Sequence, residues 1–158
     1  MRMSSRSLLA FLAAMSLIGA PHAPASAAAA PPTGELVAQV VCGGCNGFRY
    51  QNPGEKAVYL VIDGVRHHVP DELTYFNLWA NWAGLQSGGA VIDIGAPLVS
   101  GSYLARENET GRIYLVGRTK RWIRNGQILD QYAFDRSRIR NVNRASLPAE
   151  GPVIPGRS

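Results

Sequence analysis

The chain has 158 residues, of which 46% are hydrophobic and 17% are charged, and its formal net charge is +5. This composition excludes an intrinsically disordered chain, which would hold fewer apolar and more charged residues. About 130 residues remain once an N-terminal export segment is set aside, enough to bury a core without disulfide reinforcement. We therefore expect one folded domain, from about residue 34 to residue 153.

Residues 1–27 predict a secretory signal peptide. Arg2 and Arg6 precede an uninterrupted apolar run over residues 8–20, and Ala25-Ser26-Ala27 supplies a cleavage site. A membrane anchor is the alternative, but the thirteen apolar residues would cover only roughly 20 Å of a hydrocarbon core roughly 30 Å thick. We therefore expect a secreted or extracytoplasmic protein with no stable membrane span, in which residues 28–33 form a disordered leader.

Residues 34–98 predict a first β-rich unit. An apolar stretch from Glu35 to Val41 predicts its first strand. The runs 58–62 and 65–69 are rich in β-branched and aromatic residues, and Asp63-Gly64 separates them. Asp-Gly favours the type I′ turn of a two-residue hairpin, so these runs predict two paired strands.

A short helix is predicted next, over residues 71–82. Its first turn is acidic, and apolar side chains follow at helical spacing. Two of them, Trp79 and Trp82, are assigned to the core, because aromatic residues three positions apart on a helix are more often core than ligand platform. An extended return over residues 90–94 ends the unit.

Cys42 and Cys45 form the motif Cys-Gly-Gly-Cys in a turn-rich loop, whereas a redox motif would lie at the start of a helix. The interval from Gly34 to Val58 is twenty-four residues, against twelve from Gly101 to Ile113. We therefore interpret the cysteines as part of an insertion of about twelve residues. A local disulfide is expected in an oxidising compartment, with redox activity and zinc binding as the alternatives.

His67, His68, Asp71 and Glu72 form the one cluster with metal-ligand or acid–base character. On a strand the two histidines point to opposite faces, so both cannot ligate one metal without distortion. The sequence also contains no nucleophile elbow, phosphate-binding loop or zinc-protease motif. We predict no catalytic residues, no metal site and no cofactor, and hence no enzyme, although a triad assembled from distant positions remains an alternative.

Residues 99–158 predict a second unit with the same order of elements. Residues 102–106 predict its first strand, residues 113–116 and 119–124 a hairpin, and residues 128–134 a weaker helix before an extended return at 141–147.

The two units repeat one another. The segment Val58-Tyr59-Leu60-Val61 returns fifty-five positions later as Ile113-Tyr114-Leu115-Val116, and residues 95–98 correspond to residues 150–153 at the same spacing. One unit could not cover both faces of its small sheet, so the two should share a core. The predicted fold class is α+β, mainly β, with two tandem repeats, each a three-stranded antiparallel meander with a short helix.

Charge separates the two units. Residues 34–98 hold three basic and six acidic residues, a balance of −3, whereas residues 99–158 hold eleven and five, a balance of +6.

The basic residues of the second unit predict a ligand site. Guanidinium groups suit phosphate or carboxylate, and Trp122 could stack on a sugar ring. If each segment is extended, Lys120, Trp122 and Arg124 share one face, as do the three arginines from 136 to 140. The predicted ligand-binding residues are Lys120, Arg121, Trp122, Arg124, Arg136, Arg138 and Arg140. A solvated basic face, or contact with the acidic first unit, is the alternative.

The first unit also carries Ala57-Val58-Tyr59-Leu60-Val61, a turn at Gly64, Val69-Pro70 and Tyr75-Phe76. It thereby resembles a repeat of secreted bacterial cell-wall-associated proteins, with an A-V-Y-L-V strand, a turn glycine, a basic pair and an Ile/Val-Pro. His67 departs from the basic pair, and Arg124 stands where the second unit should have proline. The resemblance implies a non-catalytic binding or spacing module and supplies no ligand residues.

These features predict a secreted, non-enzymatic module that binds an anionic or carbohydrate polymer at the cell envelope through its basic second unit. The alternative is a protein-interaction or inhibitor domain that uses the loop from Cys42 to Cys45 as its contact surface. Nucleic acid is not expected as a partner.

Overall fold

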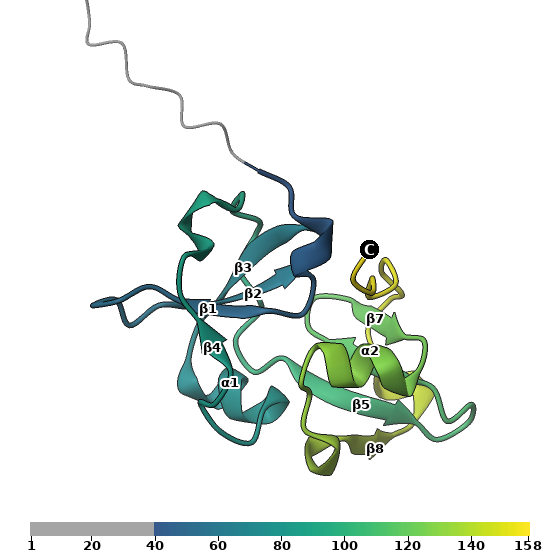
Figure 1. Ribbon diagram of the computed structural model, residues 1–158. Helices are drawn as coiled ribbons and strands as arrows, with labels where there is room; N and C mark the ends of the chain where they lie inside the picture. Colours follow the sequence, from purple (N-terminus) through teal and green to yellow (C-terminus); the bar gives the residue numbers. More distant parts are fainter. Residues whose placement is uncertain (1–39) are drawn as a thin grey trace, which may run out of the picture. The chain divides into compact units, whose positions relative to one another are not determined.

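The computed structural model describes residues 40–158 (Figure 1). This described part holds two four-stranded sheets and two α-helices and is mainly β, which confirms the predicted fold class. The predicted signal peptide, the leader and residues 35–39 of the first predicted strand lie outside the described residues. Within residues 40–158, neither helix has the length and apolarity needed to cross a bilayer.

Both sheets have the same topology. Three strands form an antiparallel meander, a helix follows, and a fourth strand pairs in parallel with the first strand of the meander. The first sheet has the order β3-β2-β1-β4 and the second β7-β6-β5-β8. The first unit contains β1 (Arg49–Gln51), β2 (Val58–Ile62), β3 (Val65–Val69), α1 (Glu72–Leu78) and β4 (Leu85–Gln86). The second contains β5 (Tyr103–Glu107), β6 (Ile113–Val116), β7 (Lys120–Ile123), α2 (Gly126–Gln131) and β8 (Arg140–Val142).

Local sequence signals fix the turns and helix starts. Asp63 and Gly64 both have positive φ, 55° and 75°, as the predicted type I′ turn requires. Asp71 caps α1 by accepting a hydrogen bond from the Thr74 N–H at 2.6 Å, and Asn125 caps α2 in the same way. The first helix ends at Leu78, four residues before the predicted end, because the chain becomes extended at Trp79.

The first strand of the first unit is β1, and the predicted strand over residues 35–41 is wrong in its described part. Val40 forms only an isolated bridge with Ile92. Arg49 faces Leu60, and Leu104 faces Leu115, so β1 and β2 have the same register as β5 and β6. The cysteines therefore precede the meander, and the predicted insertion within it is absent. The insertion was predicted because the apolar run over residues 35–41 resembles a strand in composition. The interval to Val58 was therefore counted from Gly34, which precedes that run and not β1.

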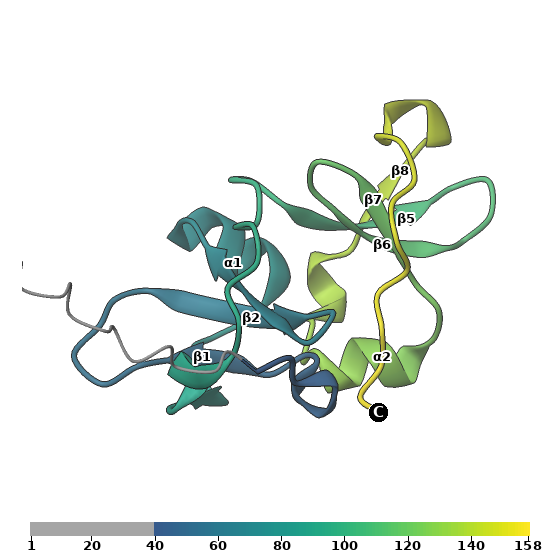
Figure 2. The ribbon, with the colours of Figure 1, turned by 90° about the horizontal axis from the view of Figure 1, so that it is seen from above.

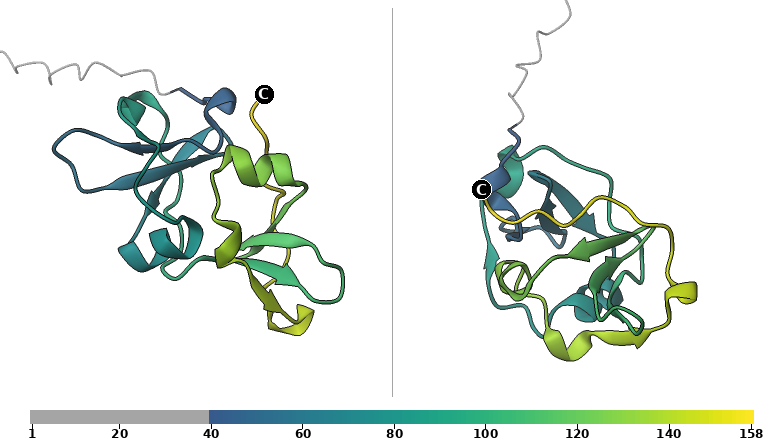
Figure 3. Two further views of the ribbon diagram at one scale, coloured as in Figure 1. Left: turned by 60° about the horizontal axis from the view of Figure 1, so that its bottom comes forward. Right: turned by 90° about the vertical axis from the view of Figure 1, so that its right-hand side faces the viewer.

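The return segments also correspond, with a shifted register. Gly95 donates its N–H to the Arg66 carbonyl, and Gly151 donates to the Lys120 carbonyl, both at 2.9 Å. The C-terminal segment thus runs beside β7 (Figure 3). Gly95 corresponds to Gly151, fifty-six residues away, and not to Glu150 as the uniform spacing of fifty-five predicted. The spacing changes because the loops of the two units differ in length.

A single hydrophobic core joins the two units, as predicted. It contains the inner side chains of both sheets and both helices, with Leu60 and Leu115 at equivalent positions. Trp79 is 1% exposed and donates its Nε1–H to the Tyr132 carbonyl at 2.9 Å. Trp82, in contrast, is 43% exposed, so its predicted core position is wrong. It lies beyond the end of the helix and stacks on Tyr75, with ring centroids 3.8 Å apart.

Candidate binding clefts

A basic cleft opens in the second unit between the start of β6, the end of β7 and the first turn of α2. Its volume is about 310 Å³, at the lower end of the range for ligand sites. Three arginines and one tryptophan provide its long side chains. The lining residues are Thr110, Gly111, Arg112, Ile113, Trp122, Ile123, Arg124, Asn125, Gly126, Leu129 and Arg136.

The three arginines give this cleft a uniformly positive charge. The guanidinium of Arg112 lies over the ring of Trp122, 4.8 Å from its centroid. Arg124 is exposed, and within the described residues neither Arg112 nor Arg124 forms an ion pair. Arg136 is held by Asp130 at 2.9 Å, but Asp130 does not line the cleft. No lining residue is acidic, so every charged side chain of the cleft would attract a bound anion.

A second cleft occupies the same place in the first unit. It is larger, about 560 Å³, and it combines aromatic, basic and acidic side chains. The residues that line it are Lys56, Ala57, Val58, His68, Val69, Pro70, Asp71, Glu72, Tyr75 and Trp82. Each has its repeat counterpart in the lining of the basic cleft, at a spacing of fifty-four or fifty-five. We call the two the mixed cleft and the basic cleft.

Substitutions at equivalent positions change the chemistry of the two clefts. Arg112, Arg124 and Arg136 of the basic cleft replace Ala57, Pro70 and Trp82 of the mixed cleft. With His68 counted as neutral, the mixed cleft has one positive and two negative side chains, a balance of −1. The basic cleft has three positive and none negative, a balance of +3. One backbone frame therefore presents two different surfaces.

Two of the predicted ligand-binding residues serve the fold. Lys120 is 8% exposed, and its Nζ lies 3.7 Å from Glu107 Oε2 and over the ring of Tyr114. Arg121 forms an ion pair at 2.8 Å with Asp63 of the first unit and donates to the carbonyls of residues 152 and 153. Arg121 thus contacts the acidic first unit, which was the alternative to ligand binding in the sequence analysis.

The three arginines from 136 to 140 do not share one extended face. Arg136–Arg138 is a 3-10 turn, and the strand begins only at Arg140. Arg138 pairs with Asp135 at 3.5 Å. Arg140 donates to Asn77 Oδ1 at 2.6 Å and lies over the ring of Tyr103. These side chains were predicted as one group because the short helical turn has no clear sequence signal.

Three of the seven predicted residues come together in the basic cleft: Trp122, Arg124 and Arg136. Sequence reasoning missed Arg112, which completes the cleft by stacking on Trp122. Its position directly before the repeated strand at Ile113 is the one signal that could have pointed to it.

A buried acidic side chain explains the role of Lys120 and Arg144. Glu107 is 1% exposed and forms ion pairs with both. The hydrogen bond from Arg144 is the main reason that the pKa of Glu107 lies below its usual value. This cluster lies on the outer face of the second sheet and satisfies its own charges, so it stabilises that face.

Of the four candidate acid–base residues, His68, Asp71 and Glu72 line the mixed cleft, and His67 does not. His67 bonds through its ring to the carbonyls of Ala96 and Ile62, whereas His68 lines the mixed cleft beside Tyr59. Asp71 caps α1 and accepts a hydrogen bond from Ser100, which is the main cause of its lowered pKa. Over residues 40–158, no group of three or more His, Cys, Asp or Glu side chains could hold a metal ion.

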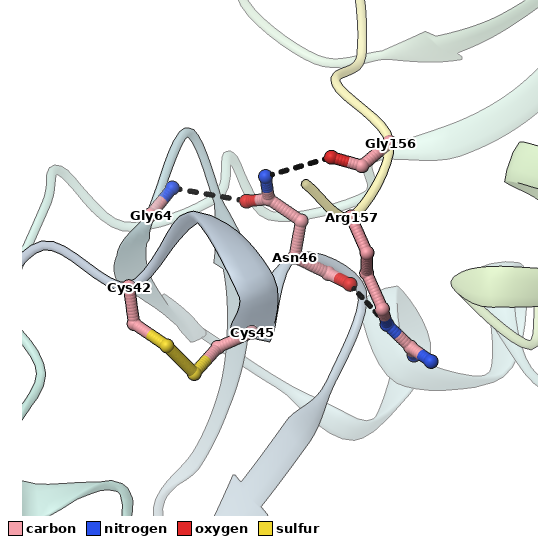
Figure 4. Close-up of a disulfide and its surroundings, with 6 residues drawn as sticks. All are labelled: Cys42, Cys45, Asn46, Gly64, Gly156 and Arg157. Carbon is pink, nitrogen blue, oxygen red and sulfur yellow. Dashed lines mark hydrogen bonds between the residues drawn. A yellow bond between two sulfur atoms is a disulfide. The ribbon is translucent and has the colours of Figure 1, made fainter.

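Cys42 and Cys45 form a disulfide in a 3-10 turn before β1 (Figure 4). The C-terminal segment closes against the next residue of this loop. Asn46 donates its side-chain N–H to the Gly156 carbonyl at 3.0 Å, and Arg157 Nε donates to the Asn46 carbonyl at 2.8 Å. The same segment passes α2 (Figure 2). The Tyr132 hydroxyl there donates to the Pro155 carbonyl at 2.9 Å. One side of the cysteine loop is therefore occupied by the chain's own end.

Comparison with known proteins gives no match: no protein-family model, no curated protein and no solved structure matches this chain. The resemblance to repeats of cell-wall-associated proteins thus stays a prediction.

Proposed function

We propose that the protein is an extracytoplasmic, non-enzymatic binding module whose basic cleft holds anionic groups of a cell-envelope polymer. The observation that carries this proposal is the cleft lined by Arg112, Arg124 and Arg136 without an acidic side chain. Guanidinium groups bind phosphate and carboxylate through paired N–H donors, and they stay charged at any physiological pH.

The arrangement of these side chains supports a binding role. Arg112 is oriented by the Trp122 ring and Arg136 by Asp130 and the Gly126 carbonyl. Side chains held in place before binding lose less conformational freedom when a ligand arrives. Among the residues that the structure describes, none supports Arg124 by an ion pair, so it is the arginine most free to follow the ligand.

Two features support a location outside the cytoplasm. The disulfide between Cys42 and Cys45 is compatible with an oxidising compartment. The predicted signal peptide over residues 1–27 agrees with it. Outside the cytoplasm, an anionic polymer of the cell envelope is the class of ligand that fits a cleft with a charge balance of +3.

The test is a titration of the purified full chain with fluorescent inorganic polyphosphate, with polygalacturonate as a carboxylate polymer and polyethylene glycol as an uncharged control without sugar rings. Arg124→Ala and Arg112→Ala should each weaken polyphosphate binding about tenfold, since one charge-assisted hydrogen bond contributes about 1.5 kcal/mol or more. Arg118→Ala is the matched control: it removes the same charge from the turn at the opposite end of the β6–β7 hairpin.

Arg118→Ala should leave binding within about twofold, because exposed charges that do not touch the ligand act only through the screened field. Equal losses for all three variants would show that net charge and not the cleft attracts the polymer, and would overturn the proposal. So would the absence of binding to both anionic polymers at low salt.

A further inference from the structure

We propose that the mixed cleft is a second binding site, and that it takes uncharged sugar rings of a polysaccharide. This inference goes beyond the proposed function, because it concerns a different cleft, a different ligand class and different side chains. It rests on the position of Trp82, on the free polar groups around it and on the comparison of the two clefts.

Trp82 provides a fixed aromatic platform at the rim of the mixed cleft. The residue is 43% exposed, although its ring stacks on that of Tyr75 and packs edge-on against that of Phe76, with ring centroids 5.3 Å apart. Tyr75 is itself fully buried, and its hydroxyl donates to the Asn81 carbonyl at 2.9 Å. The indole is therefore held in one orientation while part of it stays open to solvent. A half-exposed, rigid indole suits the apolar face of a sugar ring.

Arg49 holds the segment that carries Trp82. It is 6% exposed and donates to the Tyr75 hydroxyl and to the Ala83 carbonyl at 2.5 Å. Burial lowers the pKa of Arg49, and its contacts with the rings of Tyr75 and Trp79 offset part of that cost. At the equivalent position the second unit has Leu104, a core residue, and it has no exposed aromatic platform at Arg136.

The polar groups of the mixed cleft suit hydroxyl groups better than ions. Lys56 and Glu72 are exposed, and within the described residues neither forms an ion pair. Together with the His68 ring they offer donors and acceptors of both kinds around the platform. A balance of −1 disfavours phosphate or carboxylate, whereas neutral hydroxyls can bond to either sign of charge. Pockets with an apolar floor and a few polar groups at the rim are typical of ligand sites of this volume.

The experiment uses the full chain labelled with 5-fluorotryptophan. The sequence has three tryptophans, at 79, 82 and 122, so fluorine NMR gives one signal for each. Trp82→Phe and Trp122→Phe assign the signals. The probes are cellotetraose and chitotetraose as uncharged sugars, and inorganic polyphosphate as the anion.

We expect a tetrasaccharide to shift the Trp82 signal and leave Trp122 unchanged, and polyphosphate to do the reverse. Trp82→Ala should lose sugar binding at least tenfold and keep polyphosphate binding, which also shows that the variant is folded. Trp122→Ala is the matched control and should keep sugar binding. The proposal is overturned if neither sugar moves Trp82 at up to about 10 mM, ten times a weak Kd of about 1 mM, or if sugar moves Trp122 instead. The polyphosphate titration decides the basic cleft separately, so either proposal can fail alone.

Discussion

The mixed cleft and the basic cleft share a backbone frame and differ in almost every side chain that a ligand could touch. The hairpin, the helix cap and the apolar residue that begins the second strand, Val58 or Ile113, are retained in both units. Three arginines of the basic cleft replace alanine, proline and tryptophan of the mixed cleft. The repeated residues therefore build the frame, and the side chains that we propose to bind ligands lie where the repeat is broken.

The contact between the units is asymmetric as well. Trp79 of the first unit inserts into the shared core and bonds to Tyr132 of the second. Its repeat counterpart, Ala133, is exposed and has a positive φ of 48°. The units are thus joined by a side chain that only one of them has.

The largest expected effect is the loss of this tryptophan. Trp79→Ala removes a buried indole from the shared core and leaves the Tyr132 carbonyl without its donor, so it should cost about 3–5 kcal/mol of unfolding free energy. Chemical denaturation followed by circular dichroism measures the loss. Trp79→Phe keeps most of the ring and should cost clearly less. A loss below about 1 kcal/mol for Trp79→Ala would mean that the units do not depend on this contact.

The disulfide gives the next largest effect. Replacing Cys42 and Cys45 together by serine removes a very short covalent loop, and chain-entropy reasoning gives a cost of about 2 kcal/mol. The second unit has no cysteine and serves as the internal reference. Hydrogen exchange should therefore show faster opening at Asn46 and the C-terminal segment, while α2 amides change little. Uniform acceleration across both units would contradict a local role for the bond.

Much of the fold follows from short-range signals. Asp63-Gly64 requires a tight hairpin, and Asp71 before an apolar run starts a helix; both were predicted because the cause lies within a few residues. The first strand of the first unit was not predicted correctly. The apolar stretch at residues 35–41 has the same composition as a strand, and only pairing with residues far along the chain decides which segment joins the sheet.

The site was predicted in part for a similar reason. Alternation correctly predicted that Trp122 and Arg124 lie together, but it also included Lys120, which forms an ion pair with a buried glutamate of β5. Arg112 was missed because its neighbour Trp122 lies across the sheet, ten residues away. Charge patterns along a sequence show which side chains are available, and tertiary contacts decide which of them remain free.

An exchange between the clefts sharpens the comparison. Ala57→Arg with Pro70→Arg gives the mixed cleft two of the three arginines of the basic cleft, those at positions 112 and 124, and we expect polyphosphate binding at this site to rise about tenfold. The fluorine signal of Trp82, which we expect not to respond to polyphosphate in the wild type, should then respond. Glu72 still opposes the anion, so adding Glu72→Gly, the residue at 126, should raise binding further. Unchanged binding in the triple variant would show that the frame alone does not make an anion site.

The smallest expected effect concerns the ion pair between Asp63 and Arg121, which joins the acidic turn of the first unit to β7 of the second. The Asp63 side chain is 48% exposed, so solvent and salt screen its charge. Asp63→Asn keeps a residue that tolerates the positive φ of this turn and removes only the charge. The cost should stay below about 1 kcal/mol and should shrink in 1 M salt. A larger, salt-independent loss would show that the carboxylate is needed for the geometry of the turn, and that charge has little part in joining the two units.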